Sequence, residues 1–262
     1  YTPHAFSYLS TENKLKKFLY VAIEKVLRTK NTIILATSNS EKNQAIQVVG
    51  YEKKKVFTLK NAIDKRSIGE DKNLEKTLKS KTYICTVGRP SFQKNLEMMI
   101  GAFEIVSKNN NTVHLFIIGA GEYSPRKAKI VNMINKKNLN TRVTILPWVS
   151  RKEVQTYIKN AKLYVSSSRY EGMPYSVIES MALSVPSVLT NTDGNRDLVI
   201  DKISGYVVEI GDYVEMANKI MNLLNKSELR KKLAFEANKL FMQNHLLSNY
   251  MQNLTAHYQK HS

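Results

Sequence analysis

The chain has 262 residues, 42% of them apolar and 24% charged, which is the composition of an ordinary globular protein. Its length predicts one to two domains. No apolar run approaches the ~18–20 residues that a membrane-spanning helix needs. The single cysteine, Cys85, excludes an internal disulfide framework and suits a reducing cytoplasm, where we expect the protein to reside.

The formal net charge is +18, and 31 of the 40 basic residues are lysine. Most of these lysines fit solvated helix faces and loop tips. The alternative is attraction to a polyanion, at about 1 kcal/mol per basic residue near an anionic membrane. No zinc finger, RNA-binding aromatic motif or basic zipper accompanies the charge, so we expect no nucleic-acid partner. We expect peripheral contact with an anionic surface at the inner face of the cell membrane. The lysines gather in three clusters: Lys14, Lys16 and Lys17; Lys53, Lys54 and Lys55; Lys231 and Lys232.

Apolar, β-branched runs alternate with stretches of helical periodicity along the chain. Strands are predicted at 32–37, 56–59, 82–88, 112–119, 142–146, 163–167, 187–190 and 205–208. Helices are predicted at 41–49, 95–108, 126–138, 152–160, 175–183, 213–224, 227–244 and 246–258. Several strands are apolar throughout, as strands buried on both faces of a parallel sheet are. The alternation therefore predicts an α/β fold built from βαβ units.

A domain boundary is predicted in a charged stretch after the second strand. Residues 1–64 hold too few strands for an independent sheet and are expected to be the C-terminal part of a truncated N-terminal domain. Residues 65–81 are the expected linker, and 82–243 a complete, doubly wound C-terminal domain. A final helix at 244–262 is expected to pack back on the first domain. Since the chain opens on Tyr1, we expect it to be a piece of a longer protein, with little activity alone.

The segment from Ser166 to Glu179 carries the strongest chemical signal. A strand ends at the serines, a loop with Glu171 and Gly172 follows, and Pro174 stands where a helix is expected to begin. The start of such a helix offers free backbone N–H groups and a positive dipole end to an anion, which suits a diphosphate. Glu171 and Glu179, separated by seven residues, can bracket a ligand; the alternative is that they are incidental surface glutamates.

Four further turns follow predicted strands and are expected at the same edge of the sheet. Arg89 and Lys94, in the first of these turns, could neutralise a diphosphate, although two surface cations are unremarkable in this chain. The glycine turn, Gly119-Ala120-Gly121, is weak evidence for NAD binding, because Ser124 stands where a dinucleotide-binding fingerprint has its third glycine. The tryptophan turn could line a base pocket. A short helix is expected after the last turn, capped by Asp193 or Asn195. These turns are Gly88-Arg89 with Lys94-Asn95, Gly119-Ala120-Gly121, Pro147-Trp148-Val149, and Asp193-Gly194-Asn195-Arg196.

Taken together, these motifs resemble the C-terminal domain of the large retaining glycosyltransferase family of the GT-B type, "group 1" or family 4. Its members include the sugar transferases of capsule, exopolysaccharide and lipopolysaccharide biosynthesis. The resemblance covers about 82–208 and extends more weakly to Tyr1-Thr2-Pro3-His4 and Asn61-Ala62-Ile63-Asp64. Ala62 and Ser184 replace usual glycines, which casts doubt on the hinge and on one turn. The implied fold is a complete Rossmann-like C-terminal domain plus the tail of a Rossmann-like N-terminal domain.

The resemblance implies a retaining hexosyltransferase that moves a sugar from a nucleotide-diphosphate donor to a glycan or lipid-linked acceptor. A UDP-sugar is the favoured donor and a GDP-sugar the next. Arg89, Lys94, Glu171 and His4 are the implied catalytic residues. No Asp-x-Asp motif occurs, so we expect no dedicated metal ligands; Mg²⁺ carried by the donor diphosphate is compatible with this. The implied donor-binding residues are Gly88, Gly119, Gly121, Trp148, Val149, Gly172, Met173, Pro174, Tyr175, Ser176 and Glu179.

Two alternatives stay open on the sequence. The first is a non-catalytic module that binds nucleotides or polyanions, which the high charge and the incomplete first domain favour. The second is an NAD-dependent dehydrogenase, which Ser124 and the basic turn at Arg89 disfavour. Binding of UDP, GDP and NAD separates these classes, because only the transferase requires a nucleoside diphosphate.

Overall fold

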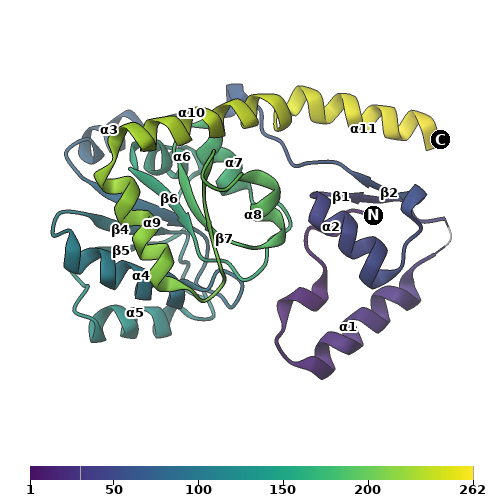
Figure 1. Ribbon diagram of the computed structural model, residues 1–262, viewed down its shortest axis with the longest axis horizontal. Helices are drawn as coiled ribbons and strands as arrows, with labels where there is room; N and C mark the ends of the chain where they lie inside the picture. The colour runs from purple at the N-terminus through teal and green to yellow at the C-terminus, as the bar shows by residue number, and fades with distance from the viewer. Residues whose placement is uncertain (30, 262) are drawn as a thin grey trace.

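The computed structural model describes residues 1–29 and 31–261 and contains two separate parallel sheets (Figure 1). The larger sheet has six strands in the order β5-β4-β3-β6-β7-β8. The reversal of strand order beside β3 is that of a doubly wound fold. The strands are β3 (Tyr83–Val87), β4 (His114–Ile118), β5 (Val143–Leu146), β6 (Leu163–Ser166), β7 (Ser187–Thr190) and β8 (Gly205–Val208).

Helices cover both faces of the larger sheet. Successive side chains of a strand point to opposite faces, so strands that are apolar throughout have two faces to bury. Ile84 packs into one core, whereas its neighbours Tyr83 and Cys85 pack into the other. The first core is closed by α4 (Leu96–Asn109), α5 (Lys127–Lys136) and α9 (Tyr213–Asn225). The second is closed by α6 (Arg151–Asn160), α7 (Tyr175–Ala182), α8 (Asp193–Leu198) and the second half of α10 (Ser227–Asn244). Burial on both faces explains why these strands are apolar throughout.

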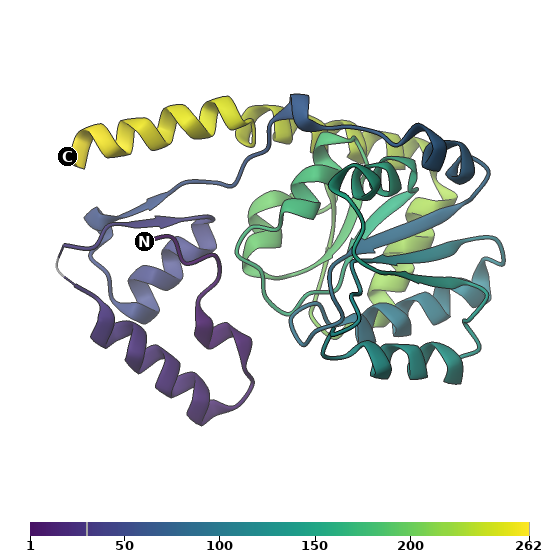
Figure 2. The same cartoon turned by 180° about the vertical axis from the view of Figure 1, so that it is seen from behind.

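The smaller unit pairs β1 (Ile34–Ala36) with β2 (Val56–Thr58) in parallel. Its helices are α1 (Lys14–Leu27) and α2 (Asn39–Gln44), the latter continued by a π-helical turn over Ala45–Val49. The last helix, α11 (Leu247–His261), runs from the larger unit across to the β1–β2 pair (Figure 2). There the His257 ring lies 4.7 Å from the Phe57 ring, measured between centroids.

The structure differs from the predicted elements in two segments. A helix, α3 (Lys72–Leu78), lies within the stretch expected to be a charged linker, and the side chain of Asp71 caps its first turn. The helix α1 also lies outside the predicted helical ranges. The helix α3 has few apolar residues to set a helical period, whereas α1 is mostly apolar but has no buried residue, so its apolar residues do not mark a core-facing side.

Ser184, at a turn where the family has glycine, adopts a left-handed conformation with φ 56°. This is the region that glycine reaches without strain and that other residues adopt only at a cost. The turn after α7 therefore keeps its glycine-type geometry in spite of the serine.

The chain between the two units is anchored by the buried His245 at the end of α10. Its Nδ1 lies 2.8 Å from the Asn61 carbonyl oxygen, which can only accept, so Nδ1 carries the proton. The backbone N–H of Ile63 donates to the His245 carbonyl at 3.0 Å, and that of Leu247 donates to the Ile63 carbonyl at 3.1 Å. The hinge segment and the C-terminal segment are thus bonded as a short parallel pair.

We expect the stability of the chain to fall at mildly acidic pH in part because of His245. Burial lowers the pKa of this imidazole in the folded chain, whereas an unfolded histidine titrates near about 6.5. Below pH ~6.5 the unfolded state therefore binds a proton that the folded state does not, and the free energy of unfolding decreases. Above that pH the contribution is fully present.

The measurement is urea unfolding between pH 5 and 7.5. His245→Asn keeps a donor for the Asn61 carbonyl but cannot titrate, so its stability should vary less with pH than that of the parent chain. His257→Asn serves as the control, because it removes a histidine outside this pair of segments. A slope for His245→Asn identical to that of the parent would show that another group is responsible.

Candidate functional site

A cavity of about 910 Å³ opens at the carboxyl edge of the larger sheet, facing the smaller unit. The turns after β3, β4 and β5 and the loop after β6 all reach it, because parallel strands end at one edge. The smaller unit and the hinge contribute His4 and Asn61 to its opposite wall.

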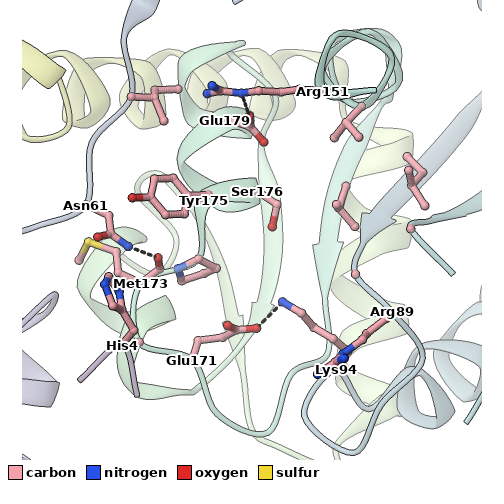
Figure 3. A pocket seen from close by; sticks show the side chains of 18 of the residues that line it. His4, Asn61, Arg89, Lys94, Arg151, Glu171, Met173, Tyr175, Ser176 and Glu179 are labelled. Atoms are coloured by element: carbon pink, nitrogen blue, oxygen red, sulfur yellow. Dashed lines mark hydrogen bonds and ion pairs between the residues drawn. The ribbon is translucent and has the colours of Figure 1, made fainter. Parts of the chain in front are cut away.

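The first pair of site residues joins a cation from one turn to a carboxylate from another (Figure 3). The Nζ atom of Lys94 lies 2.7 Å from the Glu171 Oε1 atom. Gly88 allows this approach: it has φ +145°, and a Cβ atom there would lie 2.8 Å from the Lys94 Cε atom. Arg89 lies beside Lys94 in the same cavity. It therefore adds a second cation on this side.

Glu171 is buried, and several donors hold its carboxylate. The Ser168 hydroxyl donates to Oε1 at 2.6 Å, and the Gln93 side-chain amide donates to Oε2 at 3.3 Å. Burying a carboxylate is costly unless a charged partner and hydrogen bonds replace its water, and these groups with Lys94 do so. Gln93 was not singled out in the sequence, although it stands next to Lys94.

Glu179 lies at the other end of the cavity, one turn into α7, and is also buried. Its Oε1 atom accepts from the Arg151 Nε atom at 3.1 Å and from the Gln155 side-chain amide at 3.2 Å. The two carboxylates therefore lie on either side of the loop that starts α7 (Figure 3). Burial, followed by the field of Tyr250, raises the pKa of the neighbouring Tyr175, and Arg151 opposes this.

The loop between the glutamates presents the N-terminus of α7 to the cavity. The helix α7 begins at Tyr175, as predicted for the 175–183 helix, and Pro174 is its N-cap residue rather than its first helical residue. The proline φ of −72° suits either position, which is why sequence did not separate them. The first backbone N–H groups of the helix have no partner within it and are available to an anion.

The smaller unit closes against this loop. The side-chain amide of Asn61 donates to the Met173 carbonyl at 2.8 Å. A Cβ atom on Gly172 would lie 2.9 Å from the Ala5 backbone nitrogen, so only glycine fits there. His4 and Ala5 both have positive φ, 51° and 79°, and the Ala5 N–H donates to the buried Glu41 carboxylate. Strained non-glycine residues concentrate at functional sites.

A second contact between the units joins α2 to α8. The Gln44 amide donates to Asp193, and the Ser40 N–H donates to the Asp197 carboxylate at 2.8 Å. Burial raises the pKa of Asp193. The expected capping of α8 by Asp193 or Asn195 is wrong: Thr192 is the N-cap, and Asn195 donates instead to the Thr190 carbonyl at 3.0 Å.

The glycine turn after β4 and the tryptophan turn after β5 pack on each other. A Cβ atom on Gly121 would lie 2.4 Å from the Trp148 Nε1 atom, so the absence of a side chain makes room for the indole. Gly121 supports the cavity wall in this way and does not itself line the cavity. Trp148 lines the cavity with 75% of its surface exposed, which leaves its ring open to a ligand.

Apart from Gly121, all predicted site residues line the one cavity. They are His4, Gly88, Arg89, Lys94, Gly119, Trp148, Val149, Glu171, Gly172, Met173, Pro174, Tyr175, Ser176 and Glu179. The cavity is also lined by residues that were not predicted as binding residues: Gln93, Arg151, Val154 and the hinge residues from Asn61 to Asp64. In the part of the chain that the structure describes, no group of three or more His, Cys, Asp or Glu side chains is placed to hold a metal ion.

Two units around a cavity at a sheet edge form the GT-B glycosyltransferase fold. Sucrose-phosphate synthase from Thermosynechococcus elongatus superposes with a TM-score of 0.88 at 17% identity, over 99% of this chain and 66% of that one. Anabaena HepE, solved with UDP-glucose, gives 0.84 at 17% identity, over 99% and 71%. At such identities the likeness establishes the fold.

The sequence also matches the family described as "Glycosyl transferases group 1" over residues 67–240, more than half of the chain, and the protein belongs to that family. It is 24% identical over 242 residues to the UDP-Gal:alpha-D-GlcNAc-diphosphoundecaprenol alpha-1,3-galactosyltransferase of Escherichia coli. The match covers 87% of this chain and 62% of that protein, so the chain spans less than two thirds of the relative's length.

We expect Gly194→Ala to disrupt the site from outside the cavity. A Cβ atom there would lie 2.3 Å from the Gly172 carbonyl oxygen and 3.0 Å from the Met173 nitrogen, both backbone atoms that cannot yield without moving the loop. Such overpacking costs about 1–3 kcal/mol. Urea unfolding measures this loss, with Gly69→Ala as control because its Cβ would meet only the Lys152 side chain, at 3.5 Å. Equal stabilities of the two variants would contradict the close packing of α8 against the loop.

Proposed function

We propose that this protein is the donor-binding part of a retaining glycosyltransferase that uses a nucleotide-diphosphate sugar, with UDP-sugars favoured and GDP-sugars next. The acceptor in this proposal is a glycan or lipid-linked sugar of cell-surface polysaccharide biosynthesis. One observation carries the proposal: cations, a helix N-terminus and two buried glutamates converge on a single cavity. Its volume of about 910 Å³ matches the ~300–1,000 Å³ usual for small-molecule sites.

The leaving diphosphate is the group that Arg89, Lys94 and the α7 N-terminus suit. As the bond to the sugar breaks, negative charge builds on the departing phosphate oxygens. Donors already aimed at that charge stabilise the transition state without reorganising. Arg89 can bond bidentately, and Lys94 acts as a point charge.

The two glutamates suit the two hydroxyl-bearing ends of the donor. We assign Glu179 to the ribose hydroxyls and Glu171 to hydroxyls of the transferred sugar. This order places the diphosphate between them, across the start of α7. Trp148 and Val149 would line the base pocket, and His4 would orient the donor sugar from the smaller unit.

We propose no dedicated metal-binding carboxylates for this reaction; Mg²⁺ held by the donor's own diphosphate would add to the charge from Arg89 and Lys94. Retention at the anomeric carbon enters the proposal only through the resemblance of the motifs from Gly88 to Glu179 to a retaining family. The E. coli relative carries a lipid-diphosphate acceptor and a UDP-sugar in its name, which supports the same pairing here.

We expect UDP to bind this chain and NAD not to bind it, because the cavity offers a diphosphate site but its glycine turn has Ser124 in place of a third glycine. A ligand at ~100 times its dissociation constant should add roughly 2.7 kcal/mol to the free energy of unfolding. The chain has one tryptophan, Trp148, and it lines the cavity, so its fluorescence reports binding directly. No response to UDP or GDP at millimolar concentration would refute the site.

The same titration tests the assigned roles. Glu179→Ala and Arg89→Ala should each weaken UDP binding by about 1.5–3 kcal/mol, whereas Glu171→Ala should mainly impair discrimination among UDP-sugars. Glu228→Ala and Lys231→Ala, from an exposed ion pair on α10, are the matched charge controls. If Glu171→Ala lost affinity for UDP itself as severely as Glu179→Ala, the roles of the two glutamates would be wrong.

We further propose that the protein associates peripherally with anionic membranes, where a lipid-linked acceptor resides. Within residues 1–29 and 31–261 no helix has the length and apolar content to cross a bilayer. One helix of the smaller unit, α1, exposes apolar and basic side chains together. On α1, Leu15, Phe18 and Val26 are 78%, 72% and 82% exposed, and Lys14, Lys16 and Lys17 on the same helix are exposed too.

Vesicle co-sedimentation is the measurement for this association. Binding to anionic vesicles should be strong at low salt and weak at high salt, because each lysine contributes about 1 kcal/mol that salt screens. Replacing Lys14, Lys16 and Lys17 together by alanine should weaken binding more than replacing Lys231 and Lys232. Binding that ignores salt, or no binding to anionic vesicles, rules the proposal out.

A further inference from the structure

Gln155 connects the ribose end of the cavity to the chain between the two units. It lies on α6 with 1% of its surface exposed. Its side-chain Nε2 donates to the Glu179 Oε1 atom at 3.2 Å, and its Oε1 accepts from the Gly69 backbone N–H at 3.0 Å. A buried amide is costly unless both of its ends are bonded, and here both are.

The two partners leave this amide one orientation. A backbone N–H can only donate and an ionised carboxylate can only accept. The amide oxygen must therefore face Gly69, and the NH₂ group must face Glu179. The segment before α3 thus determines which end of Gln155 meets the carboxylate.

The same helix supplies a second donor to the same carboxylate oxygen. Arg151 stands one turn before Gln155 on α6, and its Nε donates to the Glu179 Oε1 atom at 3.1 Å. In the described part of the chain both donors to Glu179 act on Oε1, so Oε2 is left for a ligand. Arg151 is 54% exposed at its side chain, whereas Gln155 is enclosed. Gln155 is therefore the partner whose position is set by packing.

We propose that Gln155 is a positioning residue for nucleotide recognition: it holds Glu179 so that the free oxygen meets the ribose hydroxyls. It acts through Glu179 and does not line the cavity itself. This inference rests on the proposed function, in which Glu179 binds the ribose. It adds the Gly69 backbone N–H, which fixes the orientation of the Gln155 amide, to the groups on which ribose recognition depends.

Thr156, the next residue on α6, provides a matched control. Its hydroxyl accepts from the Asp71 N–H at 2.8 Å and so docks the same segment, but it makes no bond to Glu179. Thr156→Val removes that docking bond. Gln155→Met, at similar volume, removes one docking bond as well, the one from Gly69, and in addition the bond to the Glu179 carboxylate. A difference between the variants isolates the effect on Glu179 from a general loosening of the segment.

The experiment titrates UDP and 2′,3′-dideoxy-UDP by Trp148 fluorescence. The parent chain should prefer UDP, and Gln155→Met should lose about tenfold of that preference, which equals about 1.4 kcal/mol. Binding of the dideoxy compound should be the same in both, because it has no ribose hydroxyls for Glu179 to bind. Thr156→Val should keep the parent's preference. If GDP binds more tightly than UDP, GDP and 2′,3′-dideoxy-GDP are used in place of the two uridine compounds.

A merely structural role would weaken both nucleotides equally in Gln155→Met, and that result overturns the inference, as does an unchanged preference for UDP. Gln155→Met should also have no added effect in the Glu179→Ala background. Should Gln155→Met not fold, Gln155→Glu keeps the acceptor for Gly69 and sets a carboxylate against Glu179, so it should lower the same preference. Failure of the parent to bind either diphosphate overturns the proposed function. If the parent binds UDP and the Gln155 variants keep the same preference for UDP over the dideoxy compound, this inference alone is overturned.

Discussion

All six strands of the larger sheet run in parallel, and the site depends on this constraint. Parallel strands end at one edge, so turns far apart in the chain, such as those carrying Lys94 and Glu171, meet in space. An antiparallel arrangement of the same strands would put successive turns at opposite edges. The price of the parallel arrangement is burial of both sheet faces, which the helices and the C-terminal segment provide.

The cavity contains buried acidic side chains, although the protein as a whole has a large positive net charge. The surface carries a large excess of lysine, yet the site contains two buried glutamates, each held by a cation and by amide or hydroxyl donors. Breaking such a pair leaves an uncompensated buried charge, which costs more than the pair contributes to stability. These ion pairs therefore fix the positions of the two glutamates but add little to the free energy of unfolding.

Close backbone approaches join the two units at the same place. The strained turn at His4 and Ala5, from the smaller unit, meets the loop at Gly172, and Gly194 on α8 packs against the same loop from within the larger unit. The same loop thus begins α7, separates the two glutamates and contacts the smaller unit. Movement of one unit against the other would act directly on the part of the cavity at the start of α7, because the two units are in contact there.

The sequence alone determined the class of fold and most of the cavity wall. Buried parallel strands need uninterrupted apolar runs, and these runs mark β3, β4 and β6 without reference to the rest of the chain. The turns that follow them carry Arg89, Lys94 and Glu171, so the local pattern was sufficient to place these residues at one edge. The bounds of β7 and β8 were also predictable, because sharp turns flank them.

Only the tertiary structure decided which side chains support those residues and how the smaller unit and the hinge form the opposite wall of the cavity. No local signal marks Gln93, Arg151 or Gln155, since an amide or guanidinium on a turn or helix is usually solvated, and their partners lie 24 to 78 residues away. The role of Gly121 likewise depends on the indole of Trp148, which a separate strand delivers. Patterns along the chain record burial and turns, because these act on neighbouring residues; contacts between distant residues exist only once the chain has folded.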